Sequence, residues 1–501
     1  MWKEKSEERL ERYKEILRDA PLFLKAADQA RKTEAARRAD GPDNEKEYSG
    51  EDISENVSYY CLAPALCACV VWLLENALKA GIKRLYFLAR DAYFMYETAL
   101  KFCSACSLPI DCRYLSCSRY SVRIPMYHLD MDEALGYICR GGIDVTMEKI
   151  LNRAGLSPSE KEAVMEELGS AGVEYGREEL IPYAELSAIR AVLEKSTLFM
   201  EYTVQNSKRA MPLLKGYLIQ EGLTDDVPMA LADSGWVGSM QKVLNRAVEY
   251  IKKEDAENIH GYKKKNAKEG AVIKPLQGYY WGLYELPDGV NPESYHCYYF
   301  SPGYNMAQKV YFSNCLFEAV FSAPHGMTLG YKEENGRYFP VYGDISKDQK
   351  AFMETVGARL LLFADKLISV SKETPSRARA KSPLPEADKK VIYRLLRCFM
   401  GNPCPGEAEI FGRLHFSDDV LDYKSQELAA DLSQKELNAN HAFNKILSMA
   451  GIKKGFLRES AWYEASAVLS GSRVSRHLRG YAVYKRLLYL RKQRSWRKMY
   501  G

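Results

Sequence analysis

Hydrophobic and polar positions follow two alternating patterns along the middle of the chain. Short apolar runs that end abruptly in polar residues predict buried strands at Leu85–Ala89, Cys112–Leu115, Met229–Ala232 and Gly278–Tyr284. Longer apolar stretches with helical spacing predict helices at Pro64–Ala80, Tyr93–Phe102 and Met240–Ile251. The repeated order of strand, polar loop and helix predicts an α/β fold, in which helices cover a parallel or mixed sheet.

The chain divides by composition into four regions. Residues 1–57 are charged, show helical spacing and end in an acidic linker, Asp40–Asn56. Residues 58–345 contain all the predicted strands and form the α/β core. Residues 346–470 form a helical C-terminal region, which a Pro/Ser/Arg-rich segment, Thr374–Pro385, interrupts. Residues 471–501 form a basic, amphipathic tail.

Composition excludes several classes of protein. The 501 residues are 47% hydrophobic and 27% charged, which is typical of a globular protein and excludes a disordered chain or a disulfide scaffold. No run of 18 apolar residues occurs, and the first residues form no signal peptide. We therefore expect a cytoplasmic protein whose twelve cysteines are reduced.

The net charge of +5 hides an uneven distribution. Residues 471–501 contain ten lysines and arginines and no acidic residue, so the rest of the chain carries a net charge of −5. Apolar side chains alternate with these cations, which fits an anionic membrane surface or RNA, or a solvated helix packed on the body. We expect residues 471–501 to contact an anionic membrane surface, which would place the protein peripherally at the inner membrane, and we do not expect nucleic acid as the partner.

Polar residues follow the first two predicted strands directly. Arg90 and Asp91 end the first strand, and Ser118 and Arg119 come just after the second. Ligands bind at the carboxyl edge of open α/β sheets, and the planar guanidinium group suits phosphate. The sequence therefore predicts phosphate contacts from Arg90, Ser118 and Arg119. Asp91 has three open roles, as a catalytic group, a helix cap or a metal ligand.

A glycine-containing loop follows the third predicted strand. Asp233 ends that strand, and Gly235, Gly238 and Ser239 lead into the next helix. Glycines let a backbone approach an anion, and the N–H groups of a first helical turn favour negative charge. We predict a phosphate cradle here, with Asp233 as a base, a hydroxyl contact or a ligand of Mg²⁺. A tight turn with a capping serine is the alternative.

A histidine farther along the chain is another candidate catalytic group. His325 precedes a glycine, and Glu318 lies a turn or two before it, so the two side chains could form an acid–base pair. A structural histidine in a Pro-Gly turn is the alternative.

Together these segments resemble a bacterial family labelled as predicted hydrolases of the haloacid dehalogenase (HAD) superfamily. The resemblance rests on Tyr86–Asp91, Ser118–Arg119, Asp233–Gln241, Gly278–Gly282 and Ser322–Gly330. That family is often associated with cell-surface polysaccharide synthesis. The chain departs from the label, because it lacks the Asp-x-Asp-x-Thr/Val nucleophile motif and residues 1–57 are too few to hold a HAD domain. The loop after Ala232 is also similar to the diphosphosugar-binding loop of type I phosphoribosyltransferases, although it has one acid rather than two.

These resemblances imply a Rossmann-like or phosphoribosyltransferase-like core that binds a phosphorylated sugar or nucleotide sugar. We expect a cytosolic bacterial enzyme of surface-polysaccharide assembly, transferase-like in its chemistry. A non-catalytic, nucleotide-binding regulatory or scaffold protein held at the membrane by the tail is the alternative. A HAD-type hydrolase is disfavoured by the missing motif.

Overall fold

The structure is a computed structural model that describes residues 5–39, 49–142, 145–260, 275–373, 384–416, 426–449 and 458–500. Of the two predicted linkers, Asp40–Asn56 and Thr374–Pro385, residues 40–48 and 374–383 lie outside the described residues. The rest of the first linker was predicted wrongly, because residues 49–56 belong to a helix, α3 (Ser49–Val57).

A five-stranded parallel sheet forms the centre of the molecule, in the order β2-β1-β3-β4-β5. The strands are β1 (Arg84–Leu88), β2 (Asp111–Leu115), β3 (Met229–Trp236), β4 (Gln277–Leu283) and β5 (Tyr295–Phe300). The predicted α/β class is confirmed, and the sheet is parallel rather than mixed. The four predicted strands are confirmed, whereas β5 was not predicted. β3 continues through Trp236, so the residues Asp233–Trp236, predicted as a loop, belong to the strand.

Side chains of the central strands alternate between two buried layers. In β1, Leu85 and Phe87 join the larger hydrophobic core, and Tyr86 and Leu88 join a second core on the opposite face. A strand buried on both faces needs a continuous apolar run, which is the pattern that revealed β1 in the sequence.

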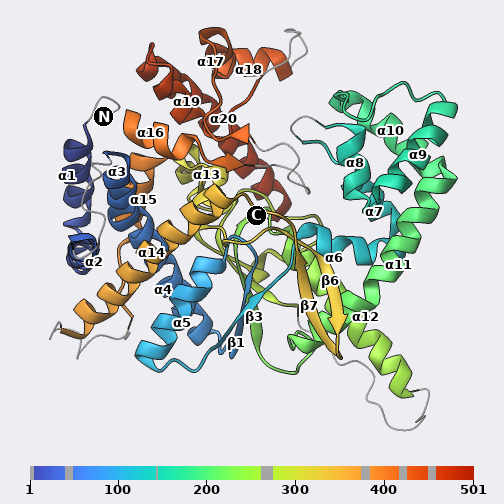
Figure 1. Cartoon of the computed structure of the whole chain (residues 1–501), viewed down its shortest axis with the longest axis horizontal. Coiled ribbons are helices and arrows are strands. Elements are labelled where there is room, and N and C mark those ends of the chain that lie inside the picture. The colour runs from blue at the N-terminus through green and yellow to red at the C-terminus, as the bar shows by residue number, and fades with distance from the viewer. Residues whose placement is uncertain are drawn as a thin grey trace.

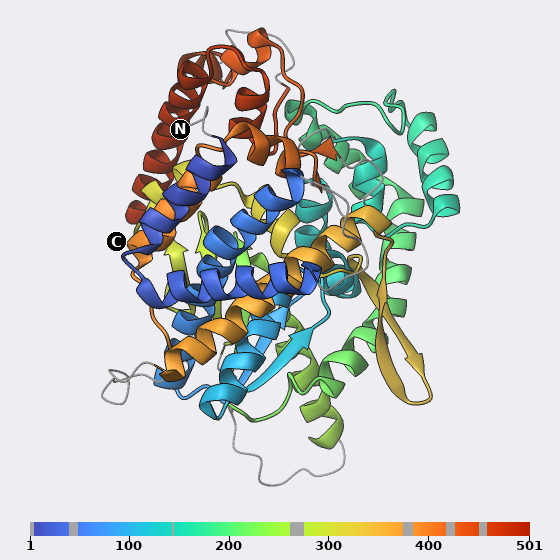
Figure 2. The ribbon, with the colours of Figure 1, turned by 60° about the vertical axis from the view of Figure 1, so that its left-hand side comes forward.

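Two helical layers cover the face of the larger core (Figures 1 and 2). The nearer helices are α4 (Ala63–Lys79), α5 (Tyr93–Cys106), α14 (Lys347–Glu373) and α15 (Lys389–Phe399). Outside them lie α1 (Ser6–Leu17), α2 (Pro21–Ala39) and α3 (Ser49–Val57). Arg9 and Tyr13 of α1 both bond to Glu407 of α16 (Pro405–Gly412), so a buried polar network fastens α1 to the C-terminal region.

Among the described residues, one helical segment is long and apolar enough to cross a membrane by length and composition alone. It runs from Asp52 to Lys79 through a π-helical turn, Ser58–Leu62. Of its most apolar window, 94% is buried inside the protein, as in the core helix of a globular domain. This helix therefore gives no reason of its own to expect a membrane span.

The opposite face of the sheet carries α6 (Arg119–Met126), α11 (Thr197–Gln220) and α12 (Ser239–His260). Between α6 and α11 the chain forms a group of helices that we call the helical insertion, at the right of Figure 1. Its members are α7 (Met131–Ile138), α8 (Met147–Arg153), α9 (Pro158–Ser170) and α10 (Leu186–Lys195). The helical insertion has a hydrophobic core of its own.

The remaining elements complete the C-terminal half. A helix, α13 (Asn314–Phe321), and a hairpin, β6 (Thr328–Glu334) and β7 (Arg337–Tyr342), follow the sheet. The last helices are α17 (Gln434–Ala439), α18 (Ala442–Met449), α19 (Tyr463–Leu469) and α20 (Val474–Tyr500). The predicted basic tail is thus a 27-residue helix.

Candidate functional site

The strand order fixes where a ligand site would form. β2 pairs with one edge of β1 and β3 with the other, so the chain leaves β1 in one direction and returns on its far side. At such a switch point the connections part, and a crevice opens beyond the carboxyl ends of the strands. The polar residues that follow β1, β2 and β3 therefore converge at one place.

A cavity of about 430 Å³ lies at this switch point. Of the predicted site residues, seven line it: Arg90, Asp91, Ser118, Arg119, Asp233, Gly235 and Ser239. Gly238 and His325 are not among its lining residues. Glu318 of α13 and Trp236 at the end of β3 also face the cavity, together with residues of the helical insertion.

Asp91 connects three segments at the cavity floor. One of its carboxylate oxygens accepts a hydrogen bond from the Ser234 hydroxyl at 2.9 Å, and the other accepts one from the Ser322 hydroxyl at 3.0 Å. The predicted capping role is wrong, because α5 begins after Ala92 without a side-chain cap. Asp91 instead ties the end of β1 to β3 and to the segment after α13.

Two further carboxyl groups lie beside Asp91. Burial, and secondly the charge of Asp91, raise the pKa of Asp233 to about 8. The same two causes, in the same order, raise the pKa of Glu318 to about 8. The Trp236 indole donates a hydrogen bond to Glu318 at 2.5 Å. Near pH 7 both carboxyl groups are therefore largely protonated and can donate a proton.

Four arginines line the same cavity. Arg90 and Arg119 follow strands, as the sequence predicted, whereas Arg140 and Arg153 come from the helical insertion and were not predicted. Arg153 donates to the backbone carbonyls of Ile138 and Arg140 and so holds the loop that carries Arg140. In the sequence, the two glycines of Arg140-Gly-Gly142 are the local signal of a loop. They do not show that this loop folds back onto the edge of the sheet.

The Ser118 hydroxyl forms its hydrogen bonds with other protein atoms. Its hydroxyl accepts a hydrogen bond from the Ser121 N–H at 3.0 Å as the cap of α6 and donates to the Thr328 carbonyl at 2.6 Å. The hydroxyl is therefore satisfied by protein atoms, although Ser118 lines the cavity.

The two predicted cradle glycines are needed for packing. Gly235 has a φ of +109°, and a Cβ there would lie 2.7 Å from the Gly282 carbonyl oxygen on β4. Gly238 has a φ of +67°, and its Cβ would lie 2.8 Å from the Tyr295 ring. Close approach to neighbouring protein thus explains both glycines. Gly235 still lines the cavity.

His325 lies apart from Glu318 and the cavity lining. Its Nδ1 is 2.8 Å from the Gly326 carbonyl oxygen, so Nδ1 carries the proton and Nε2 accepts from the Tyr114 hydroxyl, also at 2.8 Å. Both ring nitrogens are therefore used, and Glu318 bonds to Trp236 instead. The geometry matches the structural alternative and does not form the predicted acid–base pair.

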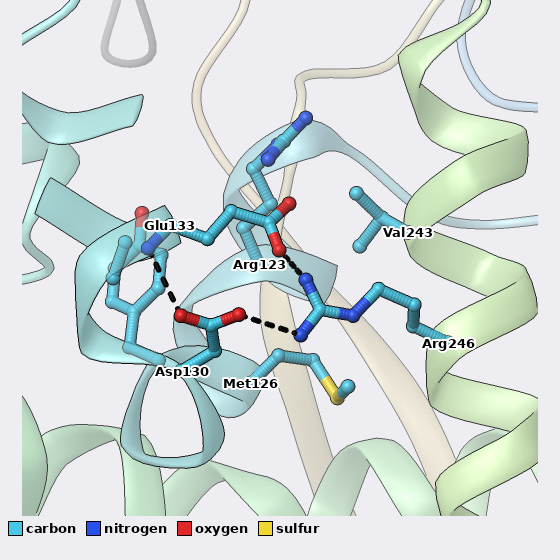
Figure 3. Close-up of a pocket in the computed structure, with 8 residues that line it drawn as sticks. Arg123, Met126, Asp130, Glu133, Val243 and Arg246 are labelled. Carbon is cyan, nitrogen blue, oxygen red and sulfur yellow. Dashed lines mark hydrogen bonds and ion pairs between the residues drawn. The ribbon is translucent and has the colours of Figure 1, made fainter. Parts of the chain in front are cut away.

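A second, smaller pocket lies between the helical insertion and α12 (Figure 3). Arg246 of α12 forms ion pairs with Glu133 and, at 3.2 Å, with Asp130. Asp130 also accepts from the Glu133 N–H as the cap of α7. These contacts anchor the helical insertion to the sheet layer and thereby fix the position of Arg140 over the cavity.

Metal binding is not indicated by the arrangement of side chains. Within the described part of the chain, no group of three or more His, Cys, Asp or Glu residues is placed to hold a metal ion. The predicted role of Asp233 as a ligand of Mg²⁺ remains a prediction.

A scan against protein-family models finds no match to the chain, and a search of curated proteins finds none either. The resemblances that the sequence motifs carry therefore stay predictions.

Proposed function

We propose that the protein binds a phosphorylated sugar or nucleotide sugar in the switch-point cavity and catalyses transfer or hydrolysis at the phosphorylated group. One observation carries the proposal: four arginines and three carboxyl groups line a single cavity of about 430 Å³. Small-molecule sites span roughly 300–1,000 Å³, so the volume suits a ligand of this size.

The charge balance of the cavity favours a polyanion. Its four guanidinium groups are cationic. Asp233 and Glu318, each with a pKa raised to about 8, contribute little negative charge at pH 7. A net positive cavity with planar, bidentate donors is suited to phosphate or diphosphate oxygens.

The carboxyl groups supply the chemistry. In the proposed step water, or a hydroxyl group of an acceptor substrate, forms the new bond and releases its proton to solvent. A protonated Asp233 or Glu318 can give its proton to the oxygen of the departing sugar or phosphate. The arginines would stabilise the charge that grows on the phosphate as the bond breaks. Asp91 would act as a positioning residue, since its two hydroxyl bonds hold Ser234 and Ser322 at the floor.

Aromatic side chains provide a surface for the uncharged part of the ligand. Tyr120, Tyr137, Trp236 and Tyr284 line the cavity together with the charged groups. Sugar and base rings pack on such faces, whereas a site for inorganic ions alone would not require them.

The biological setting is proposed from the sequence resemblance. It supports a cytoplasmic bacterial enzyme of cell-surface polysaccharide synthesis. The missing Asp-x-Asp motif argues against the aspartyl-phosphate chemistry of HAD hydrolases, because no strand of the described residues delivers that nucleophile.

A thermal-shift panel tests the ligand class. The probes are UDP-glucose, glucose 1-phosphate, phosphoribosyl diphosphate and inorganic diphosphate, each with and without Mg²⁺. At a hundred times its dissociation constant a ligand adds roughly 2.7 kcal/mol, which raises the melting temperature by a few degrees. We expect such a shift for at least one probe with wild type, and a reduced shift with Arg119→Ala and Asp233→Ala.

Arg337→Ala serves as the control, because Arg337 is exposed on β7 and does not line the cavity. A wild-type protein that none of the probes shifts would overturn the proposed ligand class. Equal shifts in wild type and both cavity variants would place the ligand elsewhere. Binding without release of phosphate, diphosphate or sugar would overturn the catalytic part and favour a regulatory or scaffold role.

A further inference from the structure

The C-terminal helix α20 is held against the protein along one face. His477 is buried, the Tyr481 ring packs against the Tyr463 ring with centroids 4.0 Å apart, and Lys485 pairs with Glu464 at 3.2 Å. These positions are spaced by four residues, so they share one side of the helix. Farther along, Lys492 pairs with Glu285 at 2.7 Å. The orientation of α20 about its own axis is therefore fixed.

The opposite side of α20 exposes an aliphatic stripe, Val483, Leu487 and Leu490. The exposed fractions of these side chains are 46%, 49% and 51%. Their spacing of four and three residues places them in one line along the helix. In Figure 2 the helix follows the outer left edge of the molecule, away from the helical insertion. Three adjacent, half-exposed aliphatic residues on an outer helix form a patch that marks an interaction surface.

Positive charge brackets the aliphatic stripe on the same side of the helix. Arg476 and Arg479 precede it at helical spacing, and Arg494, Arg497 and Lys498 follow it, all of them exposed. Residues 474–500 include nine lysines and arginines and no acidic residue. Within the described residues, none of these five cations takes part in an ion pair.

We propose that α20 docks the protein on the surface of an anionic lipid bilayer. The helix would lie in the plane of the interface, with the aliphatic stripe inserted among the acyl chains and the bracketing cations on the lipid headgroups. The exposed positive charge of these five residues selects an anionic surface. The stripe favours a bilayer over RNA, because aliphatic side chains gain nothing from a phosphate backbone.

The membrane surface and the cavity are separate features, since no residue of α20 lines the cavity. The docking proposal thus does not rest on the proposed function. Together they would hold an enzyme of phosphorylated sugars beside a membrane.

Co-sedimentation of the full chain with vesicles tests the docking. One vesicle preparation contains phosphatidylcholine alone, and the other also contains phosphatidylglycerol at roughly 30% of the lipid. We expect binding to the anionic vesicles to be at least ~10-fold stronger at low salt and to weaken at high salt. The variant Val483→Ser/Leu487→Ser/Leu490→Ser should lose most of this binding, as should Arg476→Gln/Arg479→Gln/Arg494→Gln/Arg497→Gln.

All substituted side chains are exposed or half-exposed, so both variants should retain the wild-type melting temperature. Leu180→Ser is the matched control, because Leu180 is 43% exposed on the helical insertion. Equal binding of wild type and the serine variant, or equal binding to both kinds of vesicle, would overturn the proposal. A third outcome would also overturn the docking proposal: neither protein binds vesicles, and both bind single-stranded RNA equally well. That result would favour a nucleic-acid site. A dimer that the serine substitutions dissociate would assign the stripe to a second copy of the chain.

Discussion

Replacement of Asp233 by asparagine tests the electrostatics of the cavity floor. Asparagine has nearly the shape of a protonated aspartate but cannot ionise. In wild type, the Asp233 carboxyl has its pKa raised to about 8 by burial and by Asp91. In the unfolded chain an aspartate titrates near ~3.9. Between these values the folded protein keeps a proton that the unfolded chain releases, so the stability of wild type falls as pH rises.

The size of the effect follows from this linkage. Each pH unit inside the window lowers the free energy of unfolding by about 1.4 kcal/mol for one such group. From pH 5 to pH 7 the free energy of unfolding of wild type should therefore fall by about 2.7 kcal/mol through this group, and that of Asp233→Asn should not show this fall. All other titrating groups contribute equally to both proteins and cancel in the difference.

Urea unfolding of wild type and Asp233→Asn at pH 5, 6 and 7 measures this difference. The stability of the variant relative to wild type should rise steadily across the series. Asp226→Asn is the control, because Asp226 is exposed and lies outside the cavity, and its difference from wild type should stay constant. A difference for Asp233→Asn that does not change with pH would show that Asp233 is ionised in the folded protein. Its carboxyl could then not donate a proton.

Three other consequences follow from the structure. Gly235→Ala should lower the free energy of unfolding by about 3 kcal/mol in urea titrations, because the new Cβ would meet the Gly282 carbonyl oxygen at 2.7 Å. Gly289→Ala, where no atom lies within 4 Å of the new Cβ, should cost only about 1 kcal/mol. Glu407→Ala should cost about 3–5 kcal/mol in the same assay, since it leaves the Arg9 guanidinium buried without its carboxylate. The affinity for inorganic diphosphate, measured by calorimetry, should fall as pH rises from 7 to 9, because two carboxyl groups with a pKa of about 8 then ionise in the cavity. An affinity that stays constant over this range would contradict the assigned protonation.

The strands that the sequence revealed are those with a continuous apolar run. Leu85–Leu88 of β1 and Ala230–Ala232 of β3 are buried, so these residues had to be apolar, and the polar residues after them marked the edge of the sheet. Arg90, Asp91 and Asp233 could be assigned to one site for this reason, because parallel strands end at the same edge. β5 was missed, because Tyr295–Phe300 is a short run of aromatic residues interrupted by histidine and cysteine.

The missed parts of the cavity depend on long-range packing. Arg140 lies at the sheet edge on a loop that Arg153 holds, and Asp130 and Glu133 join the helical insertion to Arg246 on α12. No local pattern in residues 131–195 reports that contact. The expected pairing of Glu318 with His325 depended on closeness in the sequence. In the structure α13 directs Glu318 into the cavity, while His325 bonds to Tyr114 outside its lining.

For the basic tail, the sequence predicted the helix, and only the structure shows which of its sides is exposed. Its helical, amphipathic character could be predicted from spacing alone, and α20 confirms the helix. The sequence did not show which side faces the protein, because Tyr481 and Leu487 are both apolar and only packing separates them. That packing leaves Val483, Leu487 and Leu490 as the outward aliphatic stripe.

Calorimetric titration of UDP-glucose into wild type and into Arg90→Ala/Arg119→Ala tests the central claim most directly. Charge-assisted hydrogen bonds contribute roughly 1.5–3 kcal/mol each, so loss of both arginines should weaken binding by at least ~100-fold. A saturable wild-type isotherm that disappears in the double variant is the predicted result. The same UDP-glucose affinity in both proteins would contradict a phosphorylated-ligand site at the switch point of the sheet. So would a wild-type protein that binds neither UDP-glucose nor any of the other three phosphorylated probes.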